Sequence, residues 1–134
     1  MEAQVIYYSR KGATRKVAEV IASEFCVKAT NVKDVTLNDN AFLILGSGCY
    51  GGKPGKDMIN FINEHDFSGK NIALFGTSGG GIGKETEAME KMIQENGGNV
   101  TDKFFCRGKF FLMNKGKPSE KDLKQAKEFA SNLK

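Results

Sequence analysis

The sequence predicts a three-layer α/β/α fold, in which helices cover both faces of a parallel β-sheet. Unbroken apolar runs at 41–45 and 71–75 are typical of strands that are buried on both sides. Amphipathic segments with helical spacing alternate with the strands along the chain, as in βαβ units. Glycine-rich loops at 9–14, 46–52 and 76–83 each follow a strand, so we expect them to meet at the sheet edge where such folds bind ligands.

The first elements flank the first glycine-containing loop. A β-branched and aromatic run at 5–8 predicts a strand that stops at Ser9. Apolar residues then recur at helical spacing from about Thr14 to Phe25, which predicts the first helix. The segment 27–32 is a short and weak strand candidate.

A polar turn at 38–40 precedes the central strand, 41–45. Pro54 and Asp57 are suited to the start of the second helix. The apolar residues that mark this helix are Met58, Ile59, Phe61 and Ile62.

The strand 71–75 is followed by a third helix that ends at Gly97-Gly98. We expect Met89, Met92 and Ile93 on its inner side.

The last strand is expected within 100–111, around 104–106. Pro118 then precedes the final helix, where Ser119 and Asp122 resemble a capping box. The apolar stripe of this helix consists of Leu123, Ala126, Ala130 and Leu133.

Length and composition indicate one ordinary globular domain spanning 1–134. Hydrophobic residues make up 40% of the chain and charged residues 27%, and no apolar run approaches the roughly 20 residues of a membrane span. The N-terminus runs into a strand without a basic and apolar leader. We therefore expect a cytoplasmic, monomeric protein that does not contact a membrane.

Charge and cysteine content disfavour two other classes of function. The net charge is +4, but the basic residues are scattered, and the signatures of nucleic-acid-binding domains are absent. The three cysteines form no CxxC pair and the chain has one histidine, so no metal site is expected. We expect Cys26 and Cys106 to be core thiols, whereas Cys49 lies in a glycine-rich loop.

The loop 9–14 has the features of a phosphate site. A turn from a strand into a helix exposes backbone amides at the positive end of the helix dipole, where the hydroxyls of Ser9 and Thr14 can donate hydrogen bonds. The triphosphate motif GxxxxGK[ST] is absent, and Lys11 precedes the only glycine of the loop, so one phosphate fits better than three. The alternative is an ordinary N-cap, in which Ser9 or Thr14 only closes the helix.

Two further glycine patterns are poor matches to nucleotide-binding motifs. The GxGxxG at 46–51 follows the third strand, and the glycines and proline at 52–55 delay the next helix. The GIGK at 81–84 lacks the leading glycine of a P-loop, because Ser78 stands there, and Glu85 replaces the hydroxyl that would bind magnesium.

Taken together, the three loops resemble the flavodoxin family, in particular its short-chain form, over essentially the whole chain. The family pattern S/T-x-T-G-x-T in the first loop is matched at Ser9, Gly12 and Thr14, whereas Lys11 replaces a hydroxyl donor by a positive charge. The resemblance implies a flavodoxin-like sandwich with five parallel strands in the order 2-1-3-4-5. It also implies non-covalently bound FMN.

In the second loop, the resemblance implies that Tyr50 stacks on the flavin ring and that Gly51 lies beside N5, where its peptide can flip to offer a carbonyl. The third loop departs from many flavodoxins, because 77–81 contains no aromatic residue for the opposite face of the ring. That face is expected to be open, with Ile82 covering it in part. The cofactor-binding residues implied by the resemblance are Ser9, Arg10, Lys11, Gly12, Ala13, Thr14, Ser47, Gly48, Cys49, Tyr50, Gly51, Gly52, Gly76, Thr77, Ser78, Gly79, Gly80, Gly81 and Ile82.

The resemblance implies single-electron transfer at low potential through FMN, without catalytic side chains. An open ring face leaves an alternative, an FMN-dependent NAD(P)H:quinone or small-molecule reductase. A flavin-free module that recognises a partner through the same sheet edge is a third hypothesis. Because the chain is basic, whereas the family is usually acidic, we expect an acidic redox partner such as a ferredoxin or a reductase.

Overall fold

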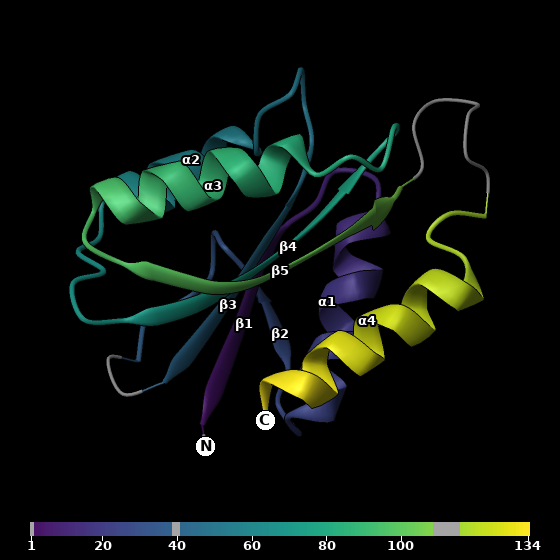
Figure 1. Cartoon of the computed structure of the whole chain (residues 1–134), viewed down its shortest axis with the longest axis horizontal. Helices are drawn as coiled ribbons and strands as arrows, with labels where there is room; N and C mark the ends of the chain where they lie inside the picture. Colours follow the sequence, from purple (N-terminus) through teal and green to yellow (C-terminus); the bar gives the residue numbers. More distant parts are fainter. Residues whose placement is uncertain (1, 39–40, 109–115) are drawn as a thin grey trace.

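The computed structural model describes residues 2–38, 41–108 and 116–134 (Figure 1). Five strands form one parallel sheet in the order β2-β1-β3-β4-β5. Helices α2 and α3 cover one face of the sheet, and α1 and α4 cover the other (Figure 1). The predicted fold class and strand order are therefore confirmed. The elements are β1 (Ala3–Tyr8), α1 (Ala13–Glu24), β2 (Ala29–Asn31), β3 (Phe42–Gly48), α2 (Lys56–Asn63), β4 (Asn71–Ser78), α3 (Lys84–Glu95), β5 (Asn99–Arg107) and α4 (Glu120–Leu133).

The central strands are buried on both faces, as their continuous apolar sequences predict. Ile44 packs into the core under α1 and α4, whereas its neighbour Leu45 packs into the core under α2 and α3. Successive side chains of a strand point to opposite faces, so one apolar run supplies both cores. Each fully buried Leu or Ile contributes about 1.5–3 kcal/mol of hydrophobic free energy relative to an exposed one. These two cores fix the carboxyl ends of the strands at one edge.

Strands β3 and β4 extend three residues beyond the predicted apolar runs. Gly46, Ser47 and Gly48 pair with the segment 75–77 of β4 and continue the parallel ladder. A Cβ on Gly46 would lie 2.1 Å from the ring of Phe75, so this glycine makes room for a core side chain. The predicted loops at 46–52 and 76–83 therefore begin inside the sheet. Glycine in a strand marks a close approach here, and the sequence alone does not distinguish this use from a turn.

The helix ends agree with the sequence in most places. In α4, the Asp122 N–H donates to Ser119 Oγ and the Ser119 N–H donates to the Asp122 carboxylate, at 3.2 and 2.9 Å, which confirms the capping box. Ala126 and Ala130 are fully buried, and Met92 is only partly buried. No helix of the described residues is both long and apolar enough to cross a membrane.

One cysteine prediction is wrong. Cys106 is buried as expected, but Cys26 is exposed. Helix α1 ends at Glu24, and Cys26 adopts a left-handed backbone with φ of 57° in the turn that follows. The predicted turn residues 39–40, and residues 109–111 of the segment expected to contain the last strand, lie outside the described residues.

Candidate functional site

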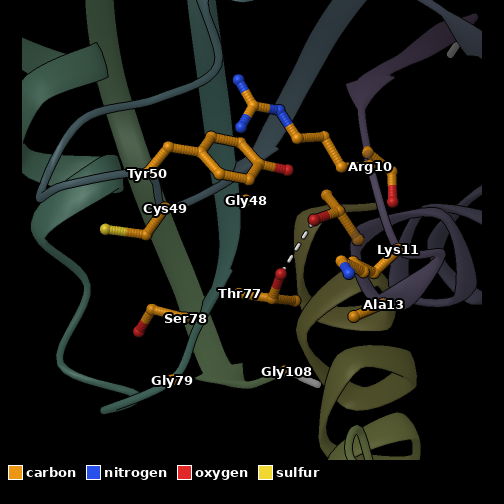
Figure 2. Close-up of a pocket in the computed structure, with 12 residues that line it drawn as sticks. Arg10, Lys11, Ala13, Gly48, Cys49, Tyr50, Thr77, Ser78, Gly79 and Gly108 are labelled. Carbon is orange, nitrogen blue, oxygen red and sulfur yellow. Dashed lines mark hydrogen bonds between the residues drawn. The ribbon is translucent and has the colours of Figure 1, made fainter. Parts of the chain in front are cut away.

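A cavity of about 160 Å³ lies at the carboxyl edge of the sheet, between the ends of β1, β3 and β4. The three glycine-containing loops predicted from the sequence therefore meet there. Figure 2 shows the side chains around this cavity. The lining residues are Ser9, Arg10, Lys11, Ala13, Thr14, Gly48, Cys49, Tyr50, Thr77, Ser78, Gly79 and Gly108.

The first loop leaves the N-terminus of α1 open toward this cavity. Gly12 is the N-cap residue, with φ of 90°, and no side chain of the described residues caps the helix. Ser9 Oγ instead accepts a hydrogen bond from the Gly12 N–H at 3.0 Å, which closes the loop before the helix begins. Neither Ser9 nor Thr14 therefore caps α1 through its side chain, contrary to the N-cap alternative. The first-turn amides, which no side chain in the described part of the chain caps, and the helix dipole favour an anion at this position.

The hydroxyl of Thr14 links the first loop to β4. Its Oγ1 lies 2.8 Å from Thr77 Oγ1, and both side chains are buried (Figure 2). Either hydroxyl can be the donor. When Thr77 donates, the hydroxyl hydrogen of Thr14 remains available to another acceptor, and both threonines line the cavity.

The second loop is a tight hairpin turn at the end of β3. The Tyr50 N–H donates to the Lys53 carbonyl at 2.7 Å, and the Lys53 N–H donates back at 3.3 Å. Gly51 and Gly52 between them have φ of 63° and 81°. Positive φ at both central residues is the requirement of a type I′ turn, which glycine meets without strain. The glycines thus hold Tyr50 in place.

Tyr50 is held between two other side chains and the cavity. The Arg10 guanidinium lies 4.1 Å from the centre of the Tyr50 ring, and the Tyr8 ring approaches it edge-on at 5.8 Å. Arg10 Nε also donates to Tyr8 Oη at 3.1 Å. In Figure 2 the guanidinium lies above the Tyr50 ring, whereas 77–79 lie below it. Burial raises the pKa of Tyr50, so its phenol stays neutral.

A second hollow of about 370 Å³ adjoins the cavity and shares Cys49, Ser78 and Gly79 with it. Ile82 lines this second hollow and is 60% exposed. Tyr50 is the only aromatic residue that lines either hollow in the described part of the chain. The side facing 77–82 therefore has no aromatic cover. The second hollow is lined by Cys49, Gly52, Ser78, Gly79, Gly80, Ile82 and Lys84.

Several predicted site residues stabilise the loops around the cavity through hydrogen bonds. Ser47 is buried and its Oγ accepts from the Gly55 N–H at 2.8 Å, which ties the second loop to the start of α2. The Gly81 N–H donates to Ser78 Oγ at 2.8 Å and fixes the third loop. The predicted residues that line neither hollow are Gly12, Ser47, Gly51, Gly76 and Gly81.

Two residues of this region were missed from the sequence. Gly108 follows β5, and a Cβ there would lie 3.0 Å from Thr77 Cβ, so the glycine lets this segment close the cavity. Because the end of the last strand was predicted only approximately, Gly108 was not recognised as a residue that follows a strand at this edge of the sheet. Glu85 was read only as a mismatch to a P-loop, yet its side chain is fully buried behind Cys49.

The residues around the cavity fit a ligand with two unlike ends. Open amides, two hydroxyls and the Lys11 side chain lie at one end and suit a phosphate. At the other end, Tyr50 and the backbone of 77–79 line the cavity and are suited to contact a flat aromatic ring. The fold and this cavity define a doubly wound α/β protein with a cavity at the carboxyl edge of its sheet, whose lining is suited to a phosphate and a flat ring.

Comparison with known proteins gives the family. A model of the flavodoxin domain matches residues 4–114. The chain is 33% identical to a flavodoxin of Clostridium beijerinckii, over 70% of this chain and 77% of that protein. Its structure resembles a flavodoxin from the domain Archaea, with a TM-score of 0.81 and 25% identity over 99% of this chain and 96% of that one. The chain belongs to the flavodoxin family.

A likeness in fold extends to a flavodoxin whose ligand is known. The Fusobacterium nucleatum flavodoxin bound to flavin mononucleotide matches with a TM-score of 0.74 and 17% identity, over 98% of this chain and 96% of that one.

Proposed function

We propose that this protein is an electron carrier that binds FMN non-covalently in the cavity between its three loops. The observation that supports the proposal is one cavity at the expected edge of a flavodoxin fold, lined by the uncapped start of α1 on one side and by Tyr50 on the other. FMN has a phosphate at one end and a flat ring at the other. When bound, it supplies one-electron redox chemistry, whereas the protein orients it and adjusts its potential.

The chain's own residues divide the binding work between the two ends. The first-turn amides of α1 and the hydroxyls of Ser9 and Thr14 hold the phosphate, and Lys11 adds a positive charge. Tyr50 stacks on the ring, and Arg10 supports the far face of Tyr50 through a cation–π contact. The electron-rich face of Tyr50 disfavours added negative charge on the ring, which lowers the potential of the flavin stacked there.

An acidic redox partner fits the charge around the cavity. Arg10 and Lys11 line the cavity and Lys84 lines the adjoining hollow, in a chain of net charge +4. Complementary charge steers the encounter of two proteins and orients their electron-transfer edges. We therefore expect a partner such as a ferredoxin or an acidic reductase, with an association rate that falls as salt is added.

The absorption spectrum of the purified protein is the first test. We expect a yellow protein that releases FMN on denaturation and accepts electrons in two separate one-electron steps during a reductive titration. A protein without flavin that also fails to take up added FMN would contradict the proposal. That result would favour a flavin-free module that uses the same sheet edge to recognise a partner.

The second hollow favours one alternative function. Because it is open beside Ile82 and carries no aromatic cover, a flat substrate could stack on the exposed side of the flavin. An FMN-dependent NAD(P)H:quinone or small-molecule reductase would use this space. Steady-state oxidation of NADH or NADPH with a quinone acceptor distinguishes this enzyme from a carrier, for which we expect negligible turnover.

A further inference from the structure

A carboxyl group lies buried behind the loop that carries Tyr50. Glu85, in the first turn of α3, is 0% exposed. Both of its carboxyl oxygens are buried and lack a hydrogen-bond partner among the described residues. Natural proteins rarely leave such a group unsatisfied, and the exceptions often have a role in function.

The fold provides space for this carboxyl group. A Cβ on Gly76, in β4, would lie 2.2 Å from Glu85 Oε1, so any side chain at position 76 would displace the carboxyl. On another side, the Cys49 thiol lies close enough to the Glu85 carboxyl to influence its pKa, without forming a hydrogen bond to it. Cys49 itself lines both the cavity and the adjoining hollow. Cys49 therefore lies between the Glu85 carboxyl and the proposed ring subsite.

The surroundings of Glu85 favour its neutral, protonated form. Burial is the main cause that raises its pKa, and the nearby Glu87 carboxylate acts in the same direction. Its own backbone N–H and the Cys49 thiol act in the opposite direction without cancelling the effect of burial. Burial, together with the charges of Asp122 and Glu85, raises the pKa of Cys106 on β5. No Lys or Arg of the described residues compensates it, so an ionised Glu85 would be a buried and unpaired negative charge.

We propose that Glu85 is a redox-linked proton-binding residue, which takes up a proton from solvent when the flavin in front of Cys49 gains an electron. This inference rests on the proposed function, because it needs FMN in the cavity. One electron enters the flavin from an external donor, such as dithionite or a redox protein, and one proton enters the Glu85 carboxylate. No bond forms between Glu85 and the flavin. Glu85 acts on the flavin potential only through its charge, and it makes no contact with the ring.

The coupling has a definite sign. An ionised Glu85 repels added negative charge on the flavin and lowers its potential, whereas a protonated Glu85 does not. Raising the pH should therefore lower the flavin potential in the range where Glu85 titrates. For one proton per electron, this contribution can approach about 59 mV per pH unit, which is a tenfold change in the equilibrium constant. Proton uptake by the flavin itself adds to this dependence in wild type and variants alike.

The test compares Glu85→Gln with the matched control Glu87→Gln. Both substitutions remove one carboxylate from the first turn of α3, but Glu87 is exposed. We expect the flavin potentials of wild type and Glu85→Gln to agree at acid pH and to separate as the pH rises, with wild type lower. Glu87→Gln should keep the pH dependence of wild type, shifted to slightly lower pH because the Glu87 carboxylate helps to raise the pKa of Glu85. Glu85→Met provides a second neutral side chain of similar size should the glutamine prevent folding.

A second experiment measures the stability of the flavin-free protein. In the flavin-free protein, a carboxyl whose pKa is raised by folding stabilises the native state below its unfolded pKa, and this contribution is lost as the pH rises through the folded pKa. The unfolding free energy of wild type, measured in urea, should therefore fall relative to Glu85→Gln as the pH rises. The control Glu87→Gln should keep the fall seen in wild type, beginning at a slightly lower pH because the Glu87 carboxylate helps to raise the pKa of Glu85.

The possible outcomes separate this inference from the proposed function. Potentials that diverge with pH for Glu85→Gln and not for Glu87→Gln would support the coupling. A constant offset between wild type and Glu85→Gln at every pH would overturn it while leaving the electron carrier intact. Failure of wild type to bind FMN would overturn both. A wild-type stability that runs parallel to Glu85→Gln in the flavin-free protein would overturn the neutral state on which the coupling depends.

Discussion

Helices α1 and α4 lie side by side on the same face of the sheet, yet their N-termini are built in opposite ways. Helix α4 starts with Ser119, whose side chain and backbone exchange hydrogen bonds with Asp122. Helix α1 starts with Gly12 in a left-handed conformation and has no side-chain cap among the described residues. One helix therefore satisfies its own first turn, whereas the other has no side-chain cap among the described residues, and there we propose that a phosphate binds.

The difference suggests a separate role for each helix N-terminus: the start of α4 stabilises its own helix, and we propose that the start of α1 binds a ligand. A capping box satisfies two backbone donors and stabilises the helix whether or not a ligand is bound. A glycine N-cap contributes little of this, but its backbone brings the amides of Ala13 and Thr14 to the cavity wall. Stability at α1 comes instead from its buried face, where Val17 and Ile21 are fully covered. The following substitutions test this division between the two termini.

The largest effect is expected for Thr14→Val. Valine keeps the shape of threonine but removes the hydroxyl that we assign to the phosphate. A hydrogen bond to a charged group contributes about 1.5–3 kcal/mol, so FMN affinity should fall by roughly ten- to a hundredfold. Fluorescence titration with FMN measures this change.

Two controls isolate the contribution of the phosphate to this loss. Riboflavin lacks the phosphate and should bind the wild type far more weakly and hardly respond to Thr14→Val. The variant Thr77→Val breaks the same Thr14–Thr77 hydrogen bond from the other side but keeps the Thr14 hydroxyl. It should therefore lower FMN affinity less than Thr14→Val does. Equal FMN and riboflavin affinities in the wild type would contradict a phosphate site at 9–14.

Ser119→Ala should lower the unfolding free energy and leave FMN affinity unchanged. Loss of an N-cap side chain costs about 0.5–2 kcal/mol of unfolding free energy. FMN affinity should stay unchanged, because Ser119 lines neither hollow. Urea unfolding and FMN titration of the same preparation measure the two quantities. A clear loss of FMN affinity would show that the two helix termini are not independent.

Asp122→Asn should alter how stability depends on acid pH. Burial opposes ionisation of Asp122, but hydrogen bonds from the Ser119 backbone and hydroxyl and the Lys117 charge together lower its pKa. The ionised side chain therefore stabilises the fold above its unfolded pKa of about 3.9, and this contribution is lost as the pH falls through the folded value. The gap in unfolding free energy between wild type and Asp122→Asn should be constant near neutral pH and narrow below about pH 4. A gap that widens in acid would contradict this role.

The sequence predicted the fold because local patterns and the global topology agree. The continuous apolar runs around Ile44 and Leu74 identified the central strands, and helical spacing identified the layers on each face. The strand ends were misplaced where glycine packs in the sheet. Gly46 lies under the ring of Phe75, and nothing local to residue 46 reveals that contact.

The candidate site was predictable where it depends on single loops and not where it depends on contacts between loops. Ser9 and Thr14 follow from a strand, a turn and a helix in succession. The stack of Arg10 on Tyr50 and the Thr14–Thr77 hydrogen bond join segments that are 40 and 63 residues apart, so no local pattern encodes them. Buried Glu85 was missed because acidic residues in the first turn of a helix are usually solvated.

The smallest effect is expected for Lys11→Ala, at the position where this chain departs from the family pattern. Lys11 is exposed and lines the cavity beside the open N-terminus of α1. Exposed ion pairs contribute about 0.2–1 kcal/mol, so FMN affinity should fall by no more than roughly fivefold at low salt. Salt screens such a pair, and the difference between wild type and Lys11→Ala should disappear at about 1 M ionic strength, where the Debye length is roughly 3 Å. Because Lys16 is also exposed but lies one turn further along α1 and lines neither hollow, Lys16→Ala is the matched control and should have a smaller effect. Equal losses for both variants would mean that the chain's overall positive charge, and not Lys11 itself, attracts the phosphate to the α1 terminus.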